Sequence, residues 1–74
     1  MTEERIRVLG NRICDMMDEL KNICQELQMS IHVDPTWHSK YNDVSTDVFI
    51  HSAGNCFYTQ NREELIDILI DNKK

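Results

Sequence analysis

Three histidines and one cysteine are the side chains in this sequence best suited to hold a metal ion. The imidazole nitrogens of His32, His38 and His51 and the sulfur of Cys56 are all ligands that zinc accepts. Zinc ligands usually come in pairs about two to four residues apart, whereas the nearest pair here, His32 and His38, flanks a stretch that contains Pro35. We therefore expect partly exposed histidines at strand and loop positions, with no bound metal or cofactor.

The same region also contains the ingredients of a cysteine nucleophile. Cys56 could attack a substrate, His51 could act as its base, and Asp47 could orient that base. Almost any small protein contains such a set, and the sequence has no GxSxG, HExxH or glycine-rich phosphate loop. A chain of 74 residues offers little concave volume unless a dimer builds it. Cys14 and Cys24 are expected to be packing or surface residues, and the protein is predicted not to be an enzyme.

Two large aromatic side chains stand in the polar segment 34–41. Trp37 and Tyr41 are residue types that dominate interface hot spots, because they bury much area at little entropic cost. If the segment is a loop on a rigid sheet, both are candidate contacts with a partner protein. The competing interpretation, which the scarcity of other aromatic side chains favours, is that Trp37 folds back as a lid on the core.

A second candidate contact surface is an acidic, amide-rich set on one face of a predicted N-terminal helix. A face of this charge could dock onto a basic surface, and could compete there with nucleic acid, because complementary charge raises the association rate and fixes register. The simpler alternative, favoured by a small and evenly distributed charge surplus, is a solvated helix face. The set consists of Asp15, Asp18, Glu19, Asn22, Gln25 and Glu26.

The helix that carries this set is predicted over residues 3–29. Thr2 can cap its N-terminus, Glu3 and Glu4 lie where the helix dipole favours negative charge, and no proline interrupts it. About 26 helical residues span roughly 39 Å, whereas a strand of five or six residues covers about 17–20 Å, so a sheet cannot cover the whole helix. Its apolar residues recur at alternating spacings of three and four, which is a heptad pattern: Ile6, Leu9, Ile13, Met16, Leu20, Ile23 and Leu27.

The charges beside this apolar stripe predict an antiparallel homodimer. With Ile6 in heptad position a, the g positions hold Arg5, Arg12, Glu19 and Glu26, a flank that is basic and then acidic and so complements its own reverse. The apolar seam would supply most of the affinity, because each exposed ion pair contributes only about 0.2–1 kcal/mol. The alternative is an amphipathic helix that packs on its own sheet, because the e positions Gly10, Met17 and Cys24 widen the apolar face.

Three strands and a second helix are predicted after residue 30. Alternation of apolar and polar residues over 30–34 indicates a short strand that Pro35 ends, and a polar stretch 36–46 follows. The runs 48–51 and 56–59 are predicted to form a hairpin through a turn at 52–55, in which Gly54 and Asn55 tolerate positive φ. Val48, Ile50 and either Phe57 or Cys56 would face the helices.

The last segment begins with a capping signal. Asn61, followed three residues later by Glu64, predicts a helix start, and the apolar residues 65–70 give that helix a broad face for the sheet. The predicted fold is therefore α+β, a single domain over residues 1–74: a long N-terminal helix, a three-stranded antiparallel meander and a short C-terminal helix, in the order α-β-β-β-α.

Composition excludes several classes of partner. Eight Lys and Arg against thirteen Asp and Glu give a net charge of −5, the wrong sign for gripping a phosphate backbone, so no direct binding of nucleic acid is expected. No apolar run approaches the roughly 18 residues of a membrane span, and the start lacks the profile of a signal peptide, which predicts a cytoplasmic protein without membrane contact. Three cysteines, an odd number without a CxxC pair, are expected to be reduced thiols.

These observations favour a small, acidic, non-enzymatic module that binds or inhibits a macromolecular protein partner by occluding a basic surface. A domain this short buries only about 60–65% of the surface its unfolded chain exposes, so we also expect self-association. Two alternatives remain open. One is a structural dimerisation domain. The other is a binder of small, nucleotide-type ligands, with a pocket between subunits built from Trp37, His38, Tyr41, His51 and Tyr58.

Overall fold

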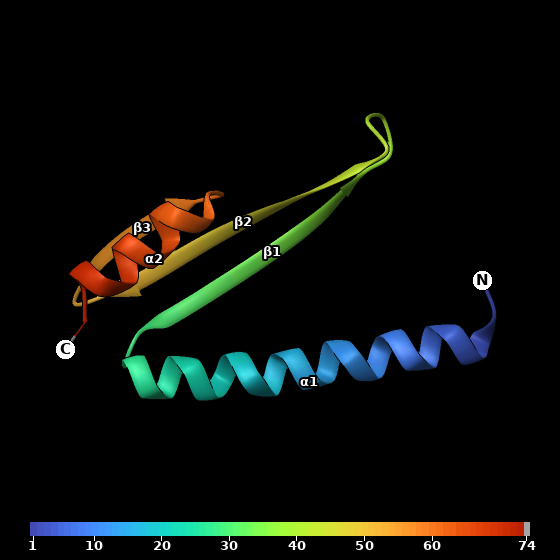
Figure 1. Ribbon diagram of the computed structural model, residues 1–74, viewed down its shortest axis with the longest axis horizontal. Coiled ribbons are helices and arrows are strands. Elements are labelled where there is room, and N and C mark those ends of the chain that lie inside the picture. Colours follow the sequence, from blue (N-terminus) through green and yellow to red (C-terminus); the bar gives the residue numbers. More distant parts are fainter. Residues whose placement is uncertain (74) are drawn as a thin grey trace.

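A computed structural model describes residues 1–73 and has the predicted α-β-β-β-α order (Figure 1). Its five elements are helix α1 (Glu3–Leu27), strands β1 (Ser30–His38), β2 (Asp43–Ser52) and β3 (Asn55–Thr59), and helix α2 (Arg62–Asp71). The strands form one antiparallel sheet in the order β1-β2-β3. The predicted fold class and meander are therefore confirmed.

Both helices begin at the predicted caps. Thr2 has extended backbone and its hydroxyl oxygen accepts a hydrogen bond from the Arg5 N–H at 3.1 Å. The side-chain oxygen of Asn61 accepts from two backbone N–H groups, those of Glu63 at 2.8 Å and Glu64 at 3.1 Å. Helix α1 ends at Leu27, two residues before the predicted end, because Gln28 adopts the left-handed conformation (φ 56°) that commonly terminates helices.

The first hairpin is much longer than its sequence predicted. Strand β1 does not end at Pro35 but continues to His38, and β2 begins at Asp43, so that most of the stretch 36–46 is strand and not loop. Proline is tolerated at this position because β1 is an edge strand with a partner on one side only. The turn between the strands includes Asn42 with a φ of 50°.

The second hairpin has the predicted pairing. Val48 lies opposite Thr59 and His51 opposite Cys56, as expected for runs 48–51 and 56–59. The positive φ angles fall at Ala53 (51°) and Gly54 (81°), one residue earlier than predicted, which makes a two-residue connection of the kind that joins twisted antiparallel strands.

The small core lies where α2 crosses the end of the sheet that β3 completes. Ile50 is fully buried, Met29 and Val48 are nearly so, and Phe57 packs against them. Successive side chains on a strand alternate between faces, so these strand residues define an inner face of the sheet and Cys56 belongs to the outer face. Helix α2 contributes three partly buried residues to this core, namely Leu65, Ile68 and Leu69.

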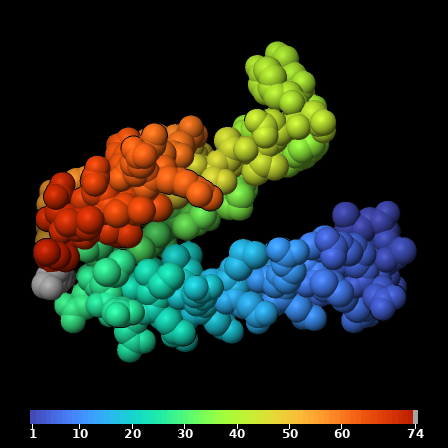
Figure 2. Space-filling model, viewed as in Figure 1, coloured from blue at the N-terminus to red at the C-terminus, as the bar shows by residue number. Residues whose placement is uncertain are grey.

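Helix α1 packs on this core only through its last turn. Leu27 contacts the core cluster, but no residue of α1 is buried. The helix and the long hairpin diverge from their junction, and the space between them widens toward the N-terminus and the hairpin tip (Figures 1 and 2). The alternative in which the helix packs on its own sheet therefore holds only for its last turn.

Candidate functional site

An apolar groove lies between α1 and β1 and encloses about 470 Å³. We call it the α1 groove. Its walls come from α1 and from two inner-face residues of β1, Val33 and Pro35, whose cross-strand partners are Val48 and Thr46. Glu19 is the charged side chain among its lining residues. The α1 wall is formed by Ile13, Met16, Met17, Glu19, Leu20 and Ile23.

The apolar side chains of the groove are strongly exposed for their type. Ile13 is 58% exposed and Met16 57%, and Val33 on the opposite wall is 42% exposed. Single exposed apolar residues are ordinary, but a contiguous patch rimmed by charged residues marks an interaction surface. Six of the seven residues of the predicted apolar stripe line the groove or continue it toward the N-terminus as exposed or half-exposed side chains: Ile6, Leu9, Ile13, Met16, Leu20 and Ile23.

Beyond the groove, the inner face continues to the hairpin tip with Trp37 and Val44, which face each other across β1 and β2. Trp37 is 59% exposed, so the interpretation that it forms a lid on the core is wrong. It also lies on a strand and not in a loop, because the hairpin is longer than predicted. Tyr41, by contrast, lies in the turn and is 72% exposed.

The acidic set predicted on the first helix is exposed throughout. It occupies the middle and last turns of α1. The one ion pair of this helix within residues 1–73 joins Arg7 to Glu3 at 2.7 Å in the first turns, so it does not involve the acidic set. The structure does not bring the acidic set together with Trp37 and Tyr41 in one chain, because the hairpin tip lies far along the diverging arm (Figure 1). The acidic residues are Asp15, Asp18, Glu19, Asn22, Gln25 and Glu26.

The outer face of the sheet carries a network that sequence reasoning missed. Asp47 accepts hydrogen bonds from the Tyr58 hydroxyl at 2.7 Å and from the Gln60 amide at 2.6 Å. The Gln60 bond, followed by the Tyr58 bond, lowers the pKa of Asp47, and the bond to Asp47 raises the pKa of Tyr58. Phe49 packs against the Tyr58 ring at 5.2 Å between centroids and against His32 at 6.0 Å.

The possible catalytic residues do not form a triad. The Cys56 sulfur lies 3.9 Å from Nε2 of His51, its partner across the second hairpin. Asp47, however, lies four residues before His51 on the same strand, with Phe49 between them on the same face, and its carboxylate is already held by Tyr58 and Gln60. Asp47 is therefore not placed to orient His51, and the predicted set of three does not assemble.

The register places all three histidines on the outer face but spreads them along it. His38 near the tip shares a 2.6 Å hydrogen bond with Ser45, whereas His51 lies at the opposite end of β2. Within residues 1–73 no group of three or more His, Cys, Asp or Glu side chains is arranged to hold a metal ion.

The five residues of the possible ligand pocket are not brought together within one chain. Trp37 lies on the inner face, while His38, His51 and Tyr58 lie on the outer face and Tyr41 lies in the turn.

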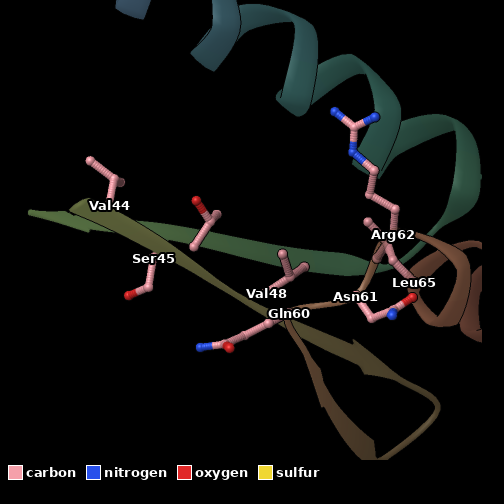
Figure 3. Close-up of a pocket in the computed structure, with 8 residues that line it drawn as sticks. Val44, Ser45, Val48, Gln60, Asn61, Arg62 and Leu65 are labelled. Atoms are coloured by element: carbon pink, nitrogen blue, oxygen red, sulfur yellow. The ribbon is translucent and has the colours of Figure 1, made fainter. Parts of the chain in front are cut away.

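A second hollow of about 590 Å³ lies where β2 extends past the end of β3, beside the start of α2 (Figure 3). Three of its polar side chains already have partners, because Asn61 caps α2, Gln60 binds Asp47 and Ser45 shares a hydrogen bond with His38. The Arg62 side chain points away from Ser45 and Gln60. This hollow exists because the first hairpin is longer than the second, so that β2 extends past β3. The sequence did not predict the hollow, because the first strand was expected to end at Pro35.

No family model matches the chain, and no curated protein or solved structure is significantly similar to it. Neither helix in the part of the chain that the structure describes is long and apolar enough to cross a membrane.

Proposed function

We propose that this protein is a non-catalytic binding module that acts as a homodimer through α1 and occludes a basic surface of a macromolecular protein partner. The observation that carries the proposal is the 25-residue helix α1, none of whose residues is buried although it bears a heptad stripe. A fold this small gains little by ordering such a helix unless another surface covers it. Binding is therefore the activity that best fits the exposed surfaces.

The acidic set and the hairpin tip are the surfaces proposed to meet the basic partner. Asp15 and Asp18 are exposed and stand apart from the apolar seam, so they remain free when the seam is covered. Trp37 and Tyr41 add exposed aromatic area of the kind that forms interface hot spots. Such a surface would favour fast association with a basic groove and would compete there with nucleic acid.

The thiols support a reducing location such as the cytoplasm. Cys14, Cys24 and Cys56 are all unpaired in the structure, two of them exposed. Exposed thiols persist in a reducing compartment and become oxidised outside it.

The experiment compares captured proteins between charge-neutralised variants. The tagged dimeric protein and its Asp15→Asn, Asp18→Asn variant are incubated with cell extract, and bound proteins are quantified by mass spectrometry. We expect the unmodified chain to capture basic proteins. The captured amount should fall at least about threefold in the variant, because two charges of the contact surface are lost. It should also fall at raised salt, because salt screens the remaining charges. Binding of a captured protein is then measured with purified components.

The matched control neutralises two acidic residues of α2, with Asp67→Asn and Asp71→Asn. It changes the net charge equally but leaves α1 untouched, so capture should persist. A second variant, Trp37→Ala, should also weaken capture. Equal capture by every variant and the unmodified chain would show that these surfaces do not bind the partner.

A further inference from the structure

The exposed surface of the chain exceeds what a compact monomer of this size presents. The accessible area is 6356 Å², whereas a folded monomer of this mass exposes about 4,800 Å². The radius of gyration is 14.8 Å, against about 11 Å for a compact chain of this length. The excess is larger than the roughly 800 Å² that each partner buries in a standard interface, so the chain has surface enough for at least one stable dimer contact.

The apolar stripe and the charged flank of α1 independently give one antiparallel register. Pairing Ile6 with Ile23 of a second copy also pairs Leu9 with Leu20 and Ile13 with Met16, so each position a meets a position d. The same register brings Arg5 near Glu26 and Arg12 near Glu19.

Leu27 is the stripe residue that this register leaves without a partner. It is also the residue of the stripe that packs against the core of its own chain. The fold therefore divides the stripe: its last residue completes the subunit, and the six before it are left for a second copy.

We propose that the N-terminal half of α1 from a second copy lies antiparallel in the α1 groove and completes the hydrophobic core of each subunit. This inference rests on the dimer in the proposed function and gives that dimer a structure. In this register residues 6–16 of the second helix lie opposite residues 13–23 of the first, which is the span that forms the groove wall. The incoming helix would also contact Val33 and Pro35, and its Arg12 would meet Glu19 at the groove.

Disulfide trapping tests the register. In a background in which the three cysteines are replaced by serine, chains carrying Ile6→Cys and chains carrying Ile23→Cys are prepared with tags of different mass, mixed and oxidised. We expect a mixed cross-linked dimer as the dominant product. Chains carrying Ile6→Cys alone should remain largely unlinked, because the two substituted positions lie about 25 Å apart in the antiparallel dimer.

The outcomes that overturn the inference are distinct. Efficient linkage of Ile6→Cys chains to each other indicates a parallel seam, and no linkage in either case shows that these helices do not meet. Circular dichroism verifies that the cysteine-free chain keeps its helices. If it does not, the second measurement below decides.

Light scattering on chains with native cysteines provides the second measurement. Glu19→Arg with Glu26→Arg should raise the dimer dissociation constant about tenfold or more at low salt, and adding Arg5→Glu with Arg12→Glu should restore it. Failure of the rescue overturns the proposed register. None of these readouts requires the basic partner, so a correct dimer with no capture in the preceding experiment would refute only the binding function.

Discussion

At the scale of single residues, register decides which side chains share a surface. The three histidines are spread over twenty residues, and their common location on the outer face follows from the pairing of His32 with Phe49 and of His38 with Asp43. A one-residue shift would have moved one strand's side chains to the opposite face. The sequence could not predict this grouping, because the strand containing both His32 and His38 was expected to end at Pro35.

The hydrogen bonds to Asp47 predict an acid-sensitive contribution to stability. Its pKa is lowered in the folded state by the bonds from Gln60 and Tyr58, so the ionised carboxylate favours folding above its ordinary pKa of 3.8. That contribution is lost as the pH falls through the lowered folded-state value. Asp47→Asn should therefore reduce stability to urea at neutral pH, and the difference from the unmodified chain should shrink in acid.

The control for this prediction is Asp67→Asn on α2, whose carboxylate has no side-chain hydrogen bond within residues 1–73. It should leave the unfolding midpoint nearly unchanged at both pH values. A difference between the Asp47 variant and the unmodified chain that stays constant with pH would contradict the assigned cause.

At the scale of elements, the two helices show how much local sequence can predict. Both N-caps were predicted because a cap needs only a polar side chain at one position and backbone N–H groups two or three residues later. The second hairpin was also predictable, since its strands are rich in β-branched and aromatic residues and its turn contains Gly54. These signals lie within ten or so residues of one another.

The extension of the first hairpin to its tip was missed because residues 36–46 lack a local strand signal. Its outer-face positions are polar, as in Thr36 and Ser45, and Pro35 interrupts the inner-face row. Pairing with the opposite strand, and not residue propensity, keeps this segment extended, which is tertiary context that a short window does not contain. The groove wall at Val33 and Pro35 depends on that hairpin and was hidden with it.

The caps predict a contrast between the helices. Asn61→Ala should lower the free energy of unfolding by about 1 kcal/mol, because two backbone N–H groups lose their partner at the start of a helix that packs on the core. Thr2→Ala should cost less, because Thr2 caps one N–H group at the end of α1 farthest from the core. Urea denaturation at one fixed protein concentration measures both losses, and a larger loss for Thr2→Ala would contradict the contrast.

At the scale of the whole molecule, the core is too small for the surface that the chain displays. The buried hydrophobic residues within 1–73 are Met29, Val48 and Ile50. They lie toward one end of a molecule 44 Å long, and α1 and the hairpin tip extend from that end (Figure 1). The heptad stripe predicted a helix that pairs with a second copy, but it did not predict the α1 groove in which that copy is proposed to lie. Only the divergence of α1 from the hairpin shows that space (Figure 2).

If a second copy completes the core, association stabilises the folded subunit, and thermal stability depends on concentration. The melting temperature should rise by about 4 °C for each tenfold increase in protein, given the unfolding entropy of two such chains. Calorimetry over a hundredfold concentration range measures this slope. Ile13→Asp puts a charge in the α1 groove and should lower the melting temperature and abolish the slope. Because Ile13 is largely exposed, the substitution removes few contacts within its own subunit.

Ile66→Asp on α2 is the matched control, because Ile66 is exposed to nearly the same degree as Ile13 but lies outside the α1 groove. It introduces the same charge into a helix and should preserve the slope. A concentration-independent melting temperature in the unmodified chain, together with a monomeric mass by light scattering, would mean that the helix and hairpin stay open in solution. The α1 groove would then be available to a different protein, and α1 would become buried only when that protein binds.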